Sequence, residues 1–169
     1  MRIGLWCFFL WISTQLVSYA GTDIERVNMT FRIEPVVTLA VESDGGNNIV
    51  AVGPVLSGSQ GVSESIRVDV RSNTSQSYRV YHVVQNEVLS ADGTRIPSTS
   101  LKISVTNGTQ GGQSAIPSSI EMPQERTIIF NSTAEGGMDQ FHIQYSVEGD
   151  QSLAAGDYYG NIFLEIEPM

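Results

Sequence analysis

The sequence of 169 residues is poor in cysteine and lysine, with only Cys7 and Lys102. Cys7 lies in an apolar N-terminal stretch, so a chain that lost this stretch would have no disulfide to stabilise it. The formal net charge is −9, whereas proteins that bind nucleic acids or anionic lipids carry clustered Lys and Arg. We therefore expect no nucleic acid as a partner, and no membrane association of the mature form.

Motifs for catalysis and metal binding are also missing. The only histidines, His82 and His142, each lie within an alternating pattern, and one isolated His supplies too few ligands for zinc. No Gly-x-Ser-x-Gly elbow occurs, and the glycines of residues 107–113 lack the Gly-Lys-Ser/Thr of a phosphate loop. The turns at residues 44–48 and 91–94 lack the EF-hand pattern. We predict no catalytic residue, no cofactor-binding residue and no metal site, and we do not expect an enzyme.

Residues 1–20 have the pattern of a secretory signal peptide. Arg2 supplies a positive charge, an apolar stretch runs from Ile3 to Ile12, and the small residues Ser18 and Ala20 suit cleavage after Ala20. The stretch is shorter than the roughly 20 apolar residues that span a bilayer. An uncleaved membrane anchor is the alternative. We expect a secreted bacterial protein of the periplasm or cell surface, with a net charge of −10 once Arg2 is removed.

Alternation of apolar and polar residues dominates the rest of the chain, and no segment longer than about ten residues has the helical period of 3.6. The pattern predicts strands at residues 27–33, 37–41, 66–71, 78–85, 101–106, 126–131, 141–147 and 161–167, and residues 49–55 are expected to form an edge strand or a crossing segment. Short strands separated by turn residues predict one domain, residues 21–169, with an all-β fold. We expect an Ig-like antiparallel β-sandwich of about seven to nine strands. The polar break at residues 72–76 is compatible with a hairpin or with a crossover between layers.

The closing strand has one apolar face. Ile162, Leu164 and Ile166 follow the pair Tyr158-Tyr159 and fall on the same side of the predicted strand. A strand with such a face must lie in a sheet, and the rest of the chain must supply that sheet. No strand pattern follows Ile166, so we expect any further partner of this edge to come from the N-terminal segment of the same or another chain.

Exposed aromatic residues provide a second candidate site. Strand parity places Tyr81, Tyr159 and Phe163 on outer faces, where they would make a platform for a sugar, although scattered surface aromatics are ordinary. Four Asn-x-Ser/Thr triplets, which would be glycan acceptors in a eukaryotic secreted chain, occur at Asn28, Asn73, Asn107 and Asn131. Such triplets also arise by chance in a chain rich in Ser, Thr and Asn.

The segment Ala155–Ile166, in which Gly-x-Tyr is followed by alternating apolar residues, resembles the closing strand of bacterial pilin subunits. The group it most resembles is that of spore coat protein U and the archaic chaperone–usher pilins. Met29–Ile33 followed by Val37–Val41 is similar to the opening strands of this group, and residues 65–71 followed by 77–80 to its next pair. The resemblance covers most of residues 21–169. Such pilins often have cysteines in the opening strands, and this sequence has none there.

The resemblance implies a structural protein of a pilus or fimbrium, with a role in cell adhesion and an Ig-like fold that lacks one strand. A periplasmic chaperone, and then the N-terminal extension of the next subunit, would donate that strand. The donor residues, within a possible extension at 21–33, would be Val27, Met29, Phe31 and Ile33. The acceptor would be an unpaired edge beside the apolar face.

Two other interpretations remain open. The four donor residues would also suit the first strand of a self-complete sandwich, because strand patterning does not tell which chain the partner belongs to. The alternative function is a monomeric extracellular or periplasmic Ig-like binding module, with carbohydrate as its candidate ligand. A hydrolase is the least favoured function.

Overall fold

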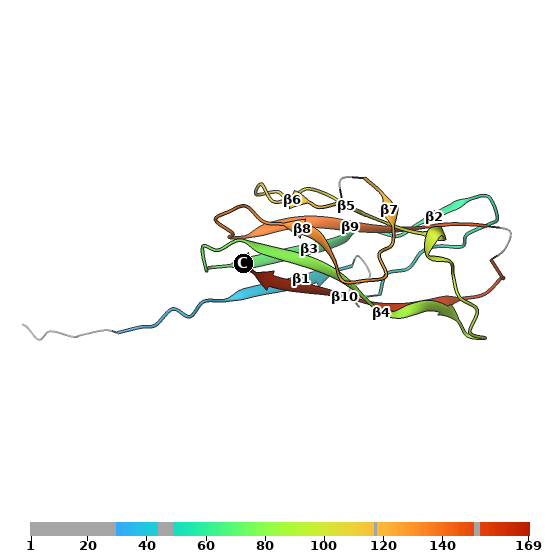
Figure 1. Cartoon of the computed structure of the whole chain (residues 1–169), viewed down its shortest axis with the longest axis horizontal. Helices are drawn as coiled ribbons and strands as arrows, with labels where there is room; N and C mark the ends of the chain where they lie inside the picture. Colours follow the sequence, from blue (N-terminus) through green and yellow to red (C-terminus); the bar gives the residue numbers. More distant parts are fainter. Residues whose placement is uncertain (1–29, 44–48, 117, 151–152) are drawn as a thin grey trace, which may run out of the picture. The chain divides into compact units, whose positions relative to one another are not determined.

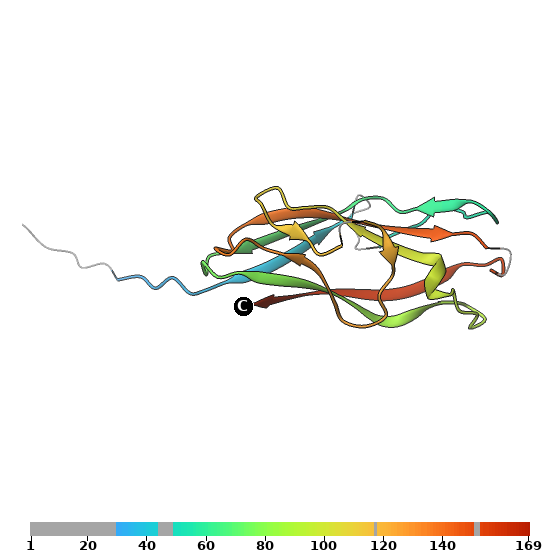
Figure 2. The same cartoon turned by 45° about the horizontal axis from the view of Figure 1, so that its top comes forward.

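The computed structural model describes residues 30–43, 49–116, 118–150 and 153–169, so the predicted signal peptide lies outside the described residues. The chain divides after Ile33 into two units, and all described strands lie in the second, Glu34–Met169. In this unit two antiparallel sheets face each other and form a sandwich (Figures 1 and 2). The prediction of an all-β sandwich is confirmed.

The larger sheet has six strands. Their order is β1-β3-β9-β5-β7, and β2 also pairs with β9. Their bounds are β1 Val37–Glu42, β2 Gln60–Val62, β3 Ile66–Ser72, β5 Leu101–Val105, β7 Ile120–Glu121 and β9 Asp139–Glu148. Buried and more exposed residues alternate along β3 and β5, because successive side chains of a strand point to opposite faces. β1 ends the order and is an edge strand.

The smaller sheet has the order β10-β4-β8-β6. Its strands are β4 Tyr78–Ser90, β6 Gln113–Ser114, β8 Thr127–Asn131 and β10 Tyr158–Pro168, and a short 3₁₀ turn, η1 Ser98–Ser100, precedes β5. Because β3 and β4 belong to different sheets, the segment between them is a crossover and not a hairpin. β10 is an edge strand like β1, and these two edges contact each other (Figures 1 and 2).

The core lies between the two sheets. Its fully buried apolar side chains include Val68, Val70, Val80, Ile103, Ile129, Phe130, Phe141 and Ile143. They come mainly from the long central strands, in which the inward-facing residues are large and apolar. Full burial of each aliphatic or aromatic side chain stabilises a fold by about 1.5–3 kcal/mol.

Two segments differ from a strand prediction. Of the edge strand and the crossing segment expected at residues 49–55, the edge strand is not formed: the segment has only an isolated bridge between Val52 and Ser63, since Gly53 and Pro54 interrupt it and proline has no N–H to donate. Residues 30–36 are not in a strand, so the strand predicted at 27–33 is not formed over its described part. β2, β6 and β7 were not predicted, because two or three residues are too few to show alternation.

Candidate functional site

The edge strands β1 and β10, one from each sheet, lie next to each other on one side of the sandwich. Five aliphatic side chains that pack against the core from these strands are only partly buried, and we call them the seam: Leu39, Val41, Ile162, Leu164 and Ile166. Their register partners one strand further in include Val68, opposite Val41, and Val80, opposite Ile166, and both partners are 0% exposed. The seam residues therefore face the core, and they stay partly exposed because β1 and β10 each pair with a described strand on one side only.

The backbone at the seam also has unused pairing capacity. Among the described residues, β1 pairs only with β3, and β10 pairs only with β4. An edge strand directs a row of its N–H and C=O groups away from its single partner. The seam thus combines apolar side chains with free ladder positions, and an added β-strand satisfies both.

The predicted site residues fall into two groups. All four residues predicted for the closing strand lie in β10, and each is partly buried. Of the predicted donor residues, Val27 and Met29 lie outside the described residues. Phe31 and Ile33 have exposed fractions of 75% and 74%. Their role in strand exchange stays a prediction.

Asn73 holds the chain immediately before β1. Its backbone N–H donates to the Val36 carbonyl at 3.2 Å, its Oδ1 accepts from the Val36 N–H at 2.7 Å, and its Nδ2 donates to the Glu34 carbonyl at 3.0 Å. These bonds continue the β1–β3 ladder beyond Ser72, where β3 ends. In the sequence, Asn73 stood out only as part of an Asn-x-Ser/Thr triplet. An Asn at a strand end is nevertheless a usable signal, because its side-chain amide can replace a peptide group.

A cluster of charged residues lies over Tyr81 on the outer face of the smaller sheet. The Arg126 guanidinium lies 3.4 Å from the centroid of the Tyr81 ring. Its Nη2 donates to Glu167 at 2.8 Å and its Nε to Glu165 at 2.9 Å. These bonds to the two carboxylates raise the pKa of Arg126, and the bond from Arg126 lowers the pKa of Glu167. Tyr81 is only 8% exposed, so its prediction as an exposed platform for a sugar is wrong.

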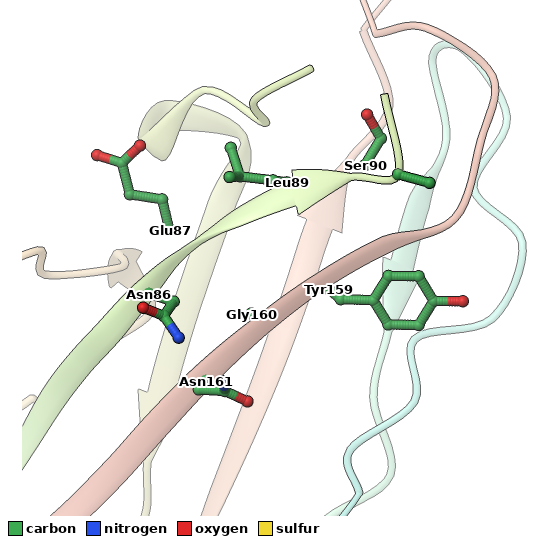
Figure 3. A pocket seen from close by; sticks show the side chains of 8 residues that line it. Asn86, Glu87, Leu89, Ser90, Tyr159, Gly160 and Asn161 are labelled. Carbon is green, nitrogen blue, oxygen red and sulfur yellow. The ribbon is translucent and has the colours of Figure 1, made fainter. Parts of the chain in front are cut away.

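Tyr159 borders a shallow pocket of about 480 Å³ at the bulge where β10 pairs with β4 (Figure 3). Asn86 and Asn161 also line the pocket, but Figure 3 shows the Tyr159 ring pointing away from both amides. A ligand site places a few polar groups so that they converge on one molecule, and these do not converge. Tyr159 and Phe163 are exposed by 69% and 50%, as strand parity predicted.

His82 lies in the core and is 0% exposed. In the described part of the chain, neither of its ring nitrogens has a hydrogen-bond partner, and its ring centroid lies 5.9 Å from that of Tyr145. Burial lowers the pKa of His82 to about 4, because the charged imidazolium loses its hydration there. His82 therefore packs in the core as a neutral ring.

The remaining observations do not assign a function. Within the described ranges, no three His, Cys, Asp or Glu side chains gather as metal ligands would. The described segments also include no helix with the length and apolar character that crossing a membrane requires. No protein-family model matches the chain, and no curated protein matches its sequence.

Proposed function

We propose that the protein is a secreted, pilin-like surface subunit that assembles with other copies by β-strand exchange. The seam carries this proposal, because its apolar side chains line two strand edges that have no partner there among the described residues. A strand inserted in the seam would pair with the backbone and bury these side chains. Full burial contributes about 1.5–3 kcal/mol for each aliphatic side chain, so completing the burial of five of them would supply a substantial driving force.

The order of the strands supports the same function. An Ig-like sandwich of seven strands has the order A-B-E-D in one sheet and C-F-G in the other. By chain order, β1, β3, β9 and β5 stand in the places of A, B, E and D, and β4 and β10 stand in those of C and F. The place of G is beside β10 at the seam, and none of the described strands occupies it.

We propose the segment before β1 of a second copy as the strand that fills the seam. Phe31 and Ile33 occupy alternate positions and are exposed by three-quarters, and Val27 and Met29 extend the same alternation in the sequence. Alternate residues of a strand point to the same side, so all four side chains would enter the core together. A periplasmic chaperone would cover the seam before assembly, since an open apolar edge promotes aggregation.

Deletion of residues 21–33 tests this function, because it removes the donor and keeps the seam. We expect the shortened chain to lose polymerisation in sedimentation experiments and to bind a fluorescent peptide of residues 21–33. The control peptide carries Phe31→Asp and Ile33→Asp and should not bind, since a carboxylate in the core would lose its hydration. A full mature chain that stays monomeric, together with a deletion variant that ignores the peptide, would rule out strand exchange.

A monomeric Ig-like module that binds carbohydrate is the second candidate function, and the exposure of Tyr159 favours it. Its ring is 69% exposed beside the pocket between β4 and β10, and such a ring offers a flat apolar face with a polar tip. Binding to a glycan array that is lost in Tyr159→Ala would support this function. Binding that persists in the variant would exclude Tyr159 as the platform.

A further inference from the structure

The bonds from Asn73 fix the direction of the chain where it enters β1. They use the Glu34 carbonyl and both the N–H and the carbonyl of Val36, so these residues stay extended beside Asn73. Pro35, between them, has no N–H that would need a partner, and it restricts Glu34 to extended conformations. The sequence and the hydrogen bonds therefore favour the same straight path into β1.

A straight path matters because a donor segment is tethered to its own seam. A short tether gives an effective concentration on the order of millimolar, which exceeds the concentration of other subunits in dilute solution. Only Glu34–Val36 separate Ile33 from the start of β1 at Val37, and hairpin loops of three residues are common. Unless these residues are held extended, the segment could reverse here and insert beside its own β1.

We propose that Asn73 is a clamp that opposes a reversal of the chain at Glu34–Val36 and so reserves the seam for the donor segment of another copy. The clamp rests on the strand-exchange function proposed above. A reversal at Glu34–Val36 would separate the Asn73 amide from the Glu34 carbonyl and the Val36 N–H, and it would lose the bonds that the extended path makes. Asn73 acts as a positioning residue, because its hydrogen bonds go to Glu34 and Val36 in the chain that enters β1.

Refolding of the mature chain, residues 21–169, at low protein concentration separates self-insertion from exchange. Exchange between copies slows on dilution, whereas self-insertion does not depend on concentration. Monomers isolated by size exclusion are mixed with a fluorescent peptide of residues 21–33, which binds only an empty seam. Wild-type monomers should bind the peptide. Compared with the wild type, Asn73→Ala should give roughly ten times more monomer that does not bind the peptide, since two side-chain hydrogen bonds no longer oppose the reversal.

Three further variants keep the test decisive. Asn86→Ala removes an exposed Asn of β4 and should behave as wild type. An insertion of four glycines between Ile33 and Glu34 lets the segment before Glu34 reverse without breaking the hydrogen bonds of Asn73. This variant should also yield monomers that do not bind the peptide. If Asn73→Ala does not fold, Asn73→Asp decides, because an ionised Asp still accepts from Val36 N–H but cannot donate to the Glu34 carbonyl.

The outcomes distinguish the clamp from the proposed function. One outcome would overturn the clamp but not strand exchange: the Asn73 variants bind the peptide as the wild type does, and the glycine insertion variant does not bind it. Wild-type monomers that neither bind the peptide nor polymerise would overturn strand exchange itself. Refusal of the peptide by the Asn73 variants, with normal binding by Asn86→Ala, supports the clamp.

Discussion

Phe130 of β8 and Phe141 of β9 stack across the sandwich, with ring centroids 4.1 Å apart and ring planes at 11°. Both side chains are 0% exposed. Because β8 and β9 belong to different sheets, this pair joins the two layers. The rings contribute through the area they bury and through the stack itself, which is worth about 0.5–1.5 kcal/mol beyond burial.

Phe130→Ala should lower the free energy of unfolding by about 3–5 kcal/mol, because it removes a buried ring and leaves a cavity against Phe141. Denaturant unfolding followed by circular dichroism measures the loss. Phe163→Ala removes the same atoms from a side chain that is 50% exposed, and its effect should be much smaller. Equal losses in the two variants would mean that the stack does not join the layers as described.

His82 should make the fold sensitive to acid. Its pKa is about 4 in the fold, against an ordinary value of 6.5, so below pH 6.5 the unfolded chain takes up a proton that the folded chain does not. The contribution of His82 to the free energy of unfolding is fully present above pH 6.5. It decreases between about pH 6.5 and 4 and does not change further below pH 4. The total change is about 3 kcal/mol. In His82→Phe, unfolding measured across this window should lose that part of the pH dependence, and a variant with an unchanged profile would assign it to other groups.

Asp139 should hold the glycine-rich loop after β5. Its Oδ1 accepts from the backbone N–H groups of Gln110 at 2.9 Å and Gln140 at 2.8 Å, and its Oδ2 accepts from that of Gly112 at 2.8 Å. Asp139→Ala leaves the buried Gly112 N–H without this acceptor, at a cost of about 1–3 kcal/mol. Hydrogen exchange at Gly112 should speed up in the variant. Asp157→Ala, at an exposed position, is the control and should leave that exchange rate unchanged.

Regular alternation made most of the fold predictable from the sequence. Residues in β3, β9 and β10 face inward at every second position, because the period of a strand fixes its faces once one residue is placed. The same parity placed the seam residues Ile162, Leu164 and Ile166 together on one apolar face of the closing strand. These predictions needed only local sequence.

Contacts between distant segments could not be predicted from the sequence. Parity placed Tyr81 on an outer face, but its burial depends on Arg126, which lies just before β8. The bonds of Asn73 to Glu34 depend on where β3 ends relative to β1. Neither contact follows from a local pattern, so the pattern identified Tyr81 as exposed and gave Asn73 no structural role.

Arg126 should stabilise the smaller sheet in a salt-dependent way. Arg126→Ala leaves the Glu165 and Glu167 carboxylates on the same face without the cation that joins them. We expect a lower melting temperature at low salt and a smaller difference at about 1 M salt, where exposed charges are screened. Arg71→Ala, which removes an exposed arginine of β3, is the control. A difference that does not shrink with salt would assign the effect to packing of Arg126 on Tyr81.

Leu164 and Phe163 are neighbours on β10 that face opposite sides of the sheet, and this makes them a matched pair for the proposed assembly. Leu164 packs against the core at the seam, whereas Phe163 is 50% exposed on the outer face. Leu164→Lys places an ammonium where a donor strand would exclude water, so binding of the residue 21–33 peptide should weaken roughly tenfold to a hundredfold.

The same variant should still fold, because a lysine at a partly exposed edge can direct its charge to solvent while no donor covers it. Phe163→Lys introduces the same charge one residue away and should leave peptide binding and polymerisation intact. Binding is read by fluorescence anisotropy, and folding by thermal melts of the same samples. If both variants weaken binding equally, the effect comes from net charge and not from the seam; if Leu164→Lys assembles as wild type does, the donor strand does not enter beside β10.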